Sequence, residues 1–117
     1  MFDSWRGFSE ATLSQEWHRT LTEQARIGRA QIIKMTTVAG SGHPGGSMSS
    51  LELFLTLYTF ARVDPKNPYR NSRDRIIVSH GHTSPGVYVA LAAAGCGGGA
   101  DGGSTGPDVV SVKVVPA

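Results

Sequence analysis

The chain has 117 residues, a length that allows one domain at most. Its formal net charge is +2 and its basic residues are scattered, which argues against a surface for nucleic acid. The single cysteine, Cys96, excludes an intrachain disulfide, and no apolar run is long enough to cross a bilayer. The chain also opens without a signal-peptide pattern. We therefore expect a cytoplasmic protein with no nucleic-acid and no membrane partner.

The first element that the sequence predicts is a long helix. A Thr12-x-x-Gln15 pattern is typical of a capping box at a helix start. Apolar residues then recur at helical spacing, which predicts one amphipathic helix from about Leu13 to Val38, ended by Gly40. A glycine inside a helix costs about 1 kcal/mol relative to alanine. We therefore expect Gly28 to mark a close crossing with another helix or a strand.

A loop of small residues, Ser41–Ser47, follows this helix and carries His43. Its glycines let the backbone approach a ligand closely, although a helix–helix corner with a surface histidine is the alternative. Ser49 and Glu52 form a second capping box, and the apolar residues after it predict another helix. Two prolines then predict a turn-rich surface connection over Val63–Arg70.

The next segment, Arg75–Val78, is short, apolar and β-branched, which predicts a strand buried on both faces in a parallel sheet. Ser79–Thr83 predicts a loop, followed by a helix with Ser84 as its N-cap and Gly95 at its end. His82 would thus lie between a strand and a helix N-terminus, where free N–H groups and the helix dipole favour a phosphate. The alternative is a histidine that only caps or packs.

The remaining patterns argue against other kinds of site. His80 and His82 are two residues apart, so in an extended loop their side chains point in opposite directions. No Cys/His/Asp cluster has the spacing of metal ligands, and no nucleophile motif such as G-x-S-x-G is present. Glycine dominates from Gly95 to Gly106, which predicts a disordered C-terminal tail. Val109–Val115 alternates like a strand but has no obvious sheet to join.

Four pieces of the sequence resemble the amino-terminal part of transketolases. They are Ile32–Met35, Ser41–Ser47, Val63–Pro68, and the run from Arg73 to His82. Their order and spacing match the family from about Ala25 to Gly95, whereas Thr83–Tyr88 departs from its commonest form. The resemblance implies an incomplete α/β thiamine-diphosphate-binding fold, rich in helices, with one or few parallel strands.

The resemblance also implies a function. Transketolases use thiamine diphosphate and a divalent metal, usually Mg²⁺, to move a two-carbon ketol unit between sugar phosphates. His43 matches the position whose imidazole faces the substrate near the reacting carbon and assists proton movement. His82 matches the position that contacts the diphosphate of the cofactor, and Gly81 would keep that approach open. Arg73 and Asp74 are expected to be structural and to hold the start of the strand.

Parts of the family pattern have no counterpart here. Its Gly-Asp-Gly motif and later asparagine, which bind diphosphate and metal, should follow Gly95, but Asp101-Gly102-Gly103 lacks the leading glycine. The pyrimidine-binding domain and its glutamate are also missing, and the family's active site lies between two subunits. The resemblance therefore implies that this chain contributes no metal ligand and is not catalytic alone. It would need a homo-oligomer or a complementary C-terminal subunit.

These patterns divide the chain into an irregular lead-in (1–11), a partial transketolase N-terminal domain (12–95) and a tail (96–117). We expect a truncated or frame-shifted product rather than a natural short subunit. One alternative is a segment of another thiamine-diphosphate enzyme, such as a deoxyxylulose-phosphate-synthase-like or pyruvate-decarboxylating relative. A second is a non-catalytic fragment or interaction subunit that docks through its long helix, Trp5 and Trp17.

Overall fold

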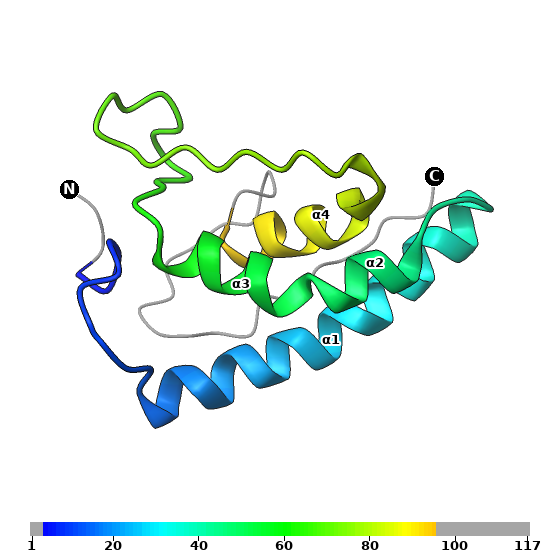
Figure 1. The fold of residues 1–117 in the computed structure, drawn as a ribbon, viewed down its shortest axis with the longest axis horizontal. Helices are drawn as coiled ribbons and strands as arrows, with labels where there is room; N and C mark the ends of the chain where they lie inside the picture. The colour runs from blue at the N-terminus through cyan, green and yellow to red at the C-terminus, as the bar shows by residue number, and fades with distance from the viewer. Residues whose placement is uncertain (1–3, 96–117) are drawn as a thin grey trace.

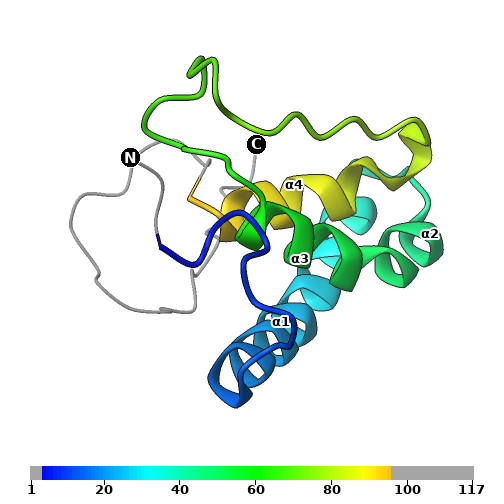
Figure 2. The same cartoon turned by 60° about the vertical axis from the view of Figure 1, so that its left-hand side comes forward.

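The computed structural model describes residues 4–95, which fold into helices joined by loops. The elements are α1 (Gln15–Ala39), α2 (Pro44–Ser49), α3 (Leu51–Phe60), the short 3₁₀ turn η1 (Gly81–Thr83) and α4 (Ser84–Ala93). α3 and α4 pack together on one side of α1, and the extended segment before η1 runs beside α4 on the side away from α1 (Figures 1 and 2). The predictions for residues 96–117 lie outside the described residues.

The long helix α1 is confirmed, and its ends have separate causes. Ser14 is the N-cap, since its side-chain oxygen accepts a hydrogen bond from the Trp17 backbone N–H at 3.2 Å. The predicted capping box at Thr12 is therefore wrong, because a second hydroxyl residue lies directly before the first helical residue. Gly40 ends the helix as predicted, in the left-handed region with φ 63°.

The core forms where α1, α3 and α4 meet, and at Gly28 the helix α1 comes close to both α3 and α4. An ideal Cβ on Gly28 would lie 2.9 Å from Cδ2 of Leu51 and 2.9 Å from Cγ1 of Val89. The predicted close crossing is confirmed, and here α1 meets two helices at once. The buried core residues are Ala25, Ile32, Leu51, Phe54, Leu55, Val89 and Ala90.

The N-terminal residues 4–14 dock on the C-terminal end of α3. Nη1 of Arg6 donates hydrogen bonds to the backbone carbonyls of Tyr58, Thr59 and Ala61, at 3.0 to 3.2 Å. A cation placed at the carbonyl end of a helix is stabilised by the helix dipole. Ring contacts extend this docking, with centroids 5.2 to 6.2 Å apart, among Trp5, Phe8, Trp17 and Phe60.

The predicted parallel strand over Arg75–Val78 is wrong, since the described part of the chain contains no strand. The segment is extended, but no backbone hydrogen bond joins residues 75–79 to other described residues. Ile77 is 87% exposed, whereas Val78 packs against the core. A strand requires a neighbouring strand about 4.8 Å away, and residues 4–95 supply none. The α/β class is therefore not confirmed, and the described fold is helical.

Asp74 fixes where the extended segment begins. Its Oδ2 accepts a hydrogen bond from the Arg62 backbone N–H at 2.7 Å, and its own N–H donates to the Arg62 carbonyl at 2.9 Å. The connection that these bonds close is rich in turns over Val63–Arg70, as predicted.

Among the residues described, no helix is long and apolar enough to span a bilayer.

Candidate functional site

The glycine-rich loop around His43 is largely helical. Pro44 opens α2, a helix of six residues, and His43 is its N-cap with φ −120° and ψ 82°. Proline suits the first helical position because the missing N–H has no intrahelical partner there. The second predicted capping box is wrong, since α3 has no side-chain cap and the Ser49 hydroxyl donates to the Gly46 carbonyl at 3.0 Å. His43 itself is exposed.

The residues before α4 wind into the 3₁₀ turn η1, in which the Thr83 N–H donates to the His80 carbonyl at 3.2 Å. Thr83, which is 2% exposed, is the N-cap of α4, so the predicted N-cap at Ser84 is wrong by one residue. The Ser84 hydroxyl donates instead to the Gly81 carbonyl. The chain turns here instead of running extended, and the rings of His80 and His82 come to the same face.

Three exposed imidazoles share this face. The ring centroids of His43 and His82 are 5.9 Å apart, with the planes at 89°, and those of His80 and His82 are 5.6 Å apart. The expectation that His80 and His82 point in opposite directions is wrong, because it assumed an extended loop. The structure thus brings both predicted histidines together and adds a third that the sequence analysis set aside. We call these residues the histidine face.

Glycines decide how closely the surrounding helices approach. An ideal Cβ on Gly46 would lie 3.0 Å from Cδ2 of His82, and one on Gly86 would lie 3.0 Å from the Ser47 carbonyl oxygen. A Cβ on Gly81 would meet nothing within 4 Å. The first two glycines let α2 pack against η1 and α4, and the third leaves one side of the histidine face open. The sequence analysis missed Gly46 and Gly86; their place close after a helix-opening proline was the available signal.

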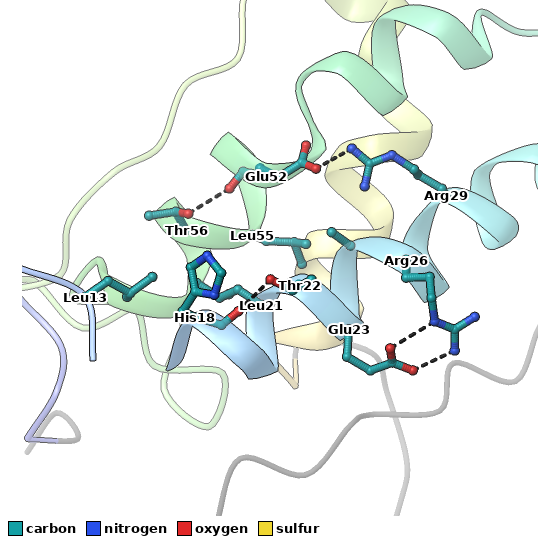
Figure 3. A pocket seen from close by; sticks show the side chains of 11 residues that line it. Leu13, His18, Leu21, Thr22, Glu23, Arg26, Arg29, Glu52, Leu55 and Thr56 are labelled. Atoms are coloured by element: carbon teal, nitrogen blue, oxygen red, sulfur yellow. Dashed lines mark hydrogen bonds and ion pairs between the residues drawn. The ribbon is translucent and has the colours of Figure 1, made fainter. Parts of the chain in front are cut away.

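A second hollow lies elsewhere, between α1 and α3. This α1–α3 groove has a volume of about 490 Å³. Its lining, shown in Figure 3, comprises Leu13, His18, Leu21, Thr22, Glu23, Ala25, Arg26, Arg29, Glu52, Leu55 and Thr56. None of the predicted site residues lines it, so groove and histidine face are separate places.

The charged groups of the groove pair with one another. Glu52 of α3 bonds Arg29 of α1, and this hydrogen bond holds the pKa of the Glu52 carboxyl below its usual value. Glu23 bonds Arg26 at 2.6 Å within α1, which likewise lowers the pKa of Glu23 (Figure 3). These pairings account for the charged groups of the lining, and therefore we take the histidine face as the candidate site.

Comparison with known proteins assigns a family. The family model described as the transketolase thiamine diphosphate binding domain matches residues 20–98, more than half of the chain. The chain belongs to the transketolase family. The matched range includes the whole histidine face. The match agrees with the sequence resemblance and supports thiamine diphosphate as the cofactor of the domain.

Individual transketolase relatives match the same region. A 6-deoxy-6-sulfo-D-fructose transketolase subunit of a Clostridium strain is 40% identical over 76 residues, covering 64% of this chain and 28% of the relative. An apulose-4-phosphate transketolase subunit of Phocaeicola vulgatus is 36% identical over 77 residues, with 65% and 27% covered. Transketolase of Mus musculus is 35% identical over 85 residues, with 69% and 13% covered. The chain thus spans little more than a quarter, or less, of these transketolases. No solved structure matches it.

The groups present fit the diphosphate of the transketolase cofactor. Imidazole N–H groups are donors suited to a diphosphate, the dipole at the N-terminus of α4, a ten-residue helix, favours an anion, and Gly81 leaves room for it. Ser47, a residue of α2, is fully buried, and its hydroxyl oxygen has no hydrogen-bond partner within the described chain. Residues 4–95 contain no group of three or more His, Cys, Asp or Glu side chains that could hold a metal ion.

Proposed function

We propose that this chain forms the diphosphate-contacting and substrate-facing part of a thiamine-diphosphate site in a transketolase-type enzyme. The enzyme would transfer a two-carbon ketol unit between sugar phosphates. The observation that carries the proposal is the shared face of His43 and His82, whose ring centroids are 5.9 Å apart although they precede different helices. Family membership over residues 20–98 supports it.

His82 is the residue we assign to the diphosphate. Its exposed ring lies against Gly46 and beside the N-terminus of α4, so an imidazole N–H and the helix dipole act on the same anion. Gly81 leaves the approach open because no side chain projects from it. Hydrogen bonds to a charged partner are stronger than neutral ones.

His43 is the residue we assign to the substrate. Thiamine diphosphate, when bound, supplies the carbanion chemistry. The His43 imidazole, at the N-cap of α2, is exposed and free to hydrogen-bond a substrate oxygen and to take up or release a proton there. The His43 and His82 ring centroids are 5.9 Å apart, so in this proposal the substrate's reacting carbon lies near His43 and the cofactor's diphosphate lies near His82.

A complete site would require more than residues 12–95, which we propose as the partial domain. Two relatives are named as transketolase subunits, which supports a partner in the form of a complementary subunit, with a second copy of this chain as the other possibility. We propose that the partner chain binds Mg²⁺ and the pyrimidine ring of the cofactor. The chain described here would then bind cofactor but not turn over substrate alone.

The test is a titration of the full chain with thiamine diphosphate, with and without Mg²⁺, followed by calorimetry and circular dichroism. We expect saturable binding that His82→Ala weakens about tenfold, since a charge-assisted hydrogen bond is lost. His43→Ala should change cofactor affinity less than about twofold, because its imidazole faces the substrate. His18→Ala, an exposed histidine of the α1–α3 groove, is the control. Absence of saturable binding, or equal losses in all three variants, would refute the proposal.

A further inference from the structure

The Thr83 hydroxyl makes two contacts with His80 that together define a tautomer. Oγ1 of Thr83 lies 2.8 Å from the His80 carbonyl oxygen and 2.6 Å from Nδ1 of the His80 ring. A hydroxyl has one proton, and a carbonyl oxygen can only accept. Both contacts are hydrogen bonds only if Thr83 donates to the carbonyl and the ring donates from Nδ1. Donation from Thr83 to Nδ1 would instead leave two oxygens 2.8 Å apart with no proton between them.

Protonation of Nδ1 leaves Nε2 of the neutral His80 ring with a lone pair. The ring is exposed, and Nε2 bonds no other residue of the described chain. The buried Thr83 holds one edge of the ring, while Phe54 and His82 lie beside it with ring centroids 6.1 Å and 5.6 Å away. The histidine face therefore includes a hydrogen-bond acceptor whose position is fixed by a buried residue.

We propose that His80 is a substrate-binding residue that selects a hydroxyl group, accepting its hydrogen bond at Nε2. This inference rests on the proposed function, because it assumes that a sugar phosphate occupies the histidine face. A fully ionised phosphate ester, the form that dominates above its second pKa of about 6, has no proton to donate to a lone pair, so Nε2 disfavours that anion. A hydroxyl can donate, and a sugar carries several. His82 and α4 then take the anionic part of the ligand and His80 takes a neutral part.

The tautomer is measured on the ligand-free full chain by long-range ¹H–¹⁵N NMR at a pH where the rings are neutral. We expect the His80 signals of an Nδ1–H ring in the wild type and in Thr83→Ser, which keeps the hydroxyl. Thr83→Val removes it and should return His80 to a mixture of tautomers. An Nε2–H ring in the wild type would overturn the inference, and this measurement needs no ligand.

Binding is tested with two probes, ribose 5-phosphate and inorganic sulfate, an anion that carries no proton at neutral pH, while the ¹⁵N signal of His80 Nε2 is followed. Ribose 5-phosphate should shift this signal and sulfate should not. His80→Asn keeps a polar atom near the Nδ1 position but loses the outer acceptor, and should weaken ribose 5-phosphate binding about fivefold. His80→Gln places an amide near Nε2 and should stay within about twofold of the wild type.

The outcomes separate this inference from the proposed function. Equal weakening of both probes by His80→Asn would overturn it, because His80 would then act on the anion. If the chain binds thiamine diphosphate but ribose 5-phosphate does not shift the ¹⁵N signal of His80 Nε2, this inference alone is overturned. If ribose 5-phosphate shifts that signal in a chain that does not bind thiamine diphosphate, the inference is supported and the proposed cofactor site is refuted.

Discussion

The imidazole of His43 meets that of His82 edge to face, with ring centroids 5.9 Å apart. The two residues precede different helices, α2 and α4, and nothing in the local sequence places them together. The approach depends on Gly46, since a side chain there would meet the His82 ring. The geometry of the candidate site is therefore set by a residue with no functional group.

Substitution of Gly46 tests this dependence. In Gly46→Ala the new methyl group would lie 3.0 Å from Cδ2 and 3.2 Å from Nε2 of His82, so the ring must move. We expect thiamine diphosphate affinity to fall about fivefold or more, a loss of about 1 kcal/mol, in a calorimetric titration. Gly45→Ala is the matched control, because it lies in the same helix and its Cβ meets nothing within 4 Å. It should keep the affinity and raise stability by up to about 1 kcal/mol. Equal affinities of the two variants would contradict the prediction.

The crossing at Gly28 gives a prediction on stability. Alanine favours a helix over glycine by about 1 kcal/mol, yet in Gly28→Ala the methyl group would lie 2.9 Å from both Leu51 and Val89. Overpacking of a core typically costs about 1–3 kcal/mol, so we expect a net loss of stability in urea unfolding. Lys34→Ala, an exposed position of the same helix, should stay within about 0.5 kcal/mol of the wild type. Increased stability of Gly28→Ala would show that the helices can separate at no cost.

The features of α1 could be predicted because they depend on neighbouring residues. Periodic apolar positions define its length, Gly40 ends it, and an interior glycine, Gly28, marks its crossing. The cap was placed at Thr12 instead of Ser14, since two hydroxyl residues lie close together and only the local backbone decides between them. His43 and His82 were found as candidates, but their proximity depends on how α2 packs against η1, which no local pattern contains.

The strand predicted over Arg75–Val78 does not form, and the reason lies outside the segment itself. Its composition is typical of a buried parallel strand, but pairing requires a neighbour, and residues 4–95 provide none. Asp74 and Val78 still hold the segment in place, through hydrogen bonds to Arg62 and contact with the core. Composition thus predicted its extended shape, and the absence of a pairing strand among the described residues left its backbone unpaired.

Hydrogen exchange tests this unpaired state. The backbone N–H groups of residues 75–79 bond no other described residue, so we expect them to exchange with solvent within seconds at neutral pH. The N–H groups in the middle of α1, between Ala25 and Ile32, should exchange far more slowly, because they are bonded within a helix that packs on the core. Mass spectrometry of deuterated peptides resolves the two regions. Strong protection of residues 75–79 would mean that another segment or chain pairs with them.

The ion pair between Arg29 and Glu52 predicts how stability changes with pH. Hydrogen bonding to the Arg29 guanidinium lowers the pKa of Glu52 from its ordinary value of 4.5 in the folded state. A carboxyl whose pKa is lowered by folding stabilises the fold above its ordinary pKa, and that contribution is lost as the pH falls through the lowered value. Both side chains are about half exposed, at 41% and 57%, so the contribution should be only about 0.2–1 kcal/mol.

Glu52→Gln isolates this contribution. At pH 7 and low salt we expect the free energy of unfolding of the variant, measured in urea, to be about 0.2–1 kcal/mol lower than that of the wild type. The reason is that the side chain of α3 that pairs with Arg29 of α1 is no longer charged. The difference should stay constant from pH 7 down to about the ordinary pKa of 4.5 and shrink as the pH falls further, through the lowered pKa of Glu52, and it should also shrink in high salt. Glu10→Gln, an exposed carboxyl of the lead-in, serves as the control. A stability difference for Glu52→Gln that does not vary with pH would show that the loss arises from packing, since only the ionised carboxylate pairs with Arg29.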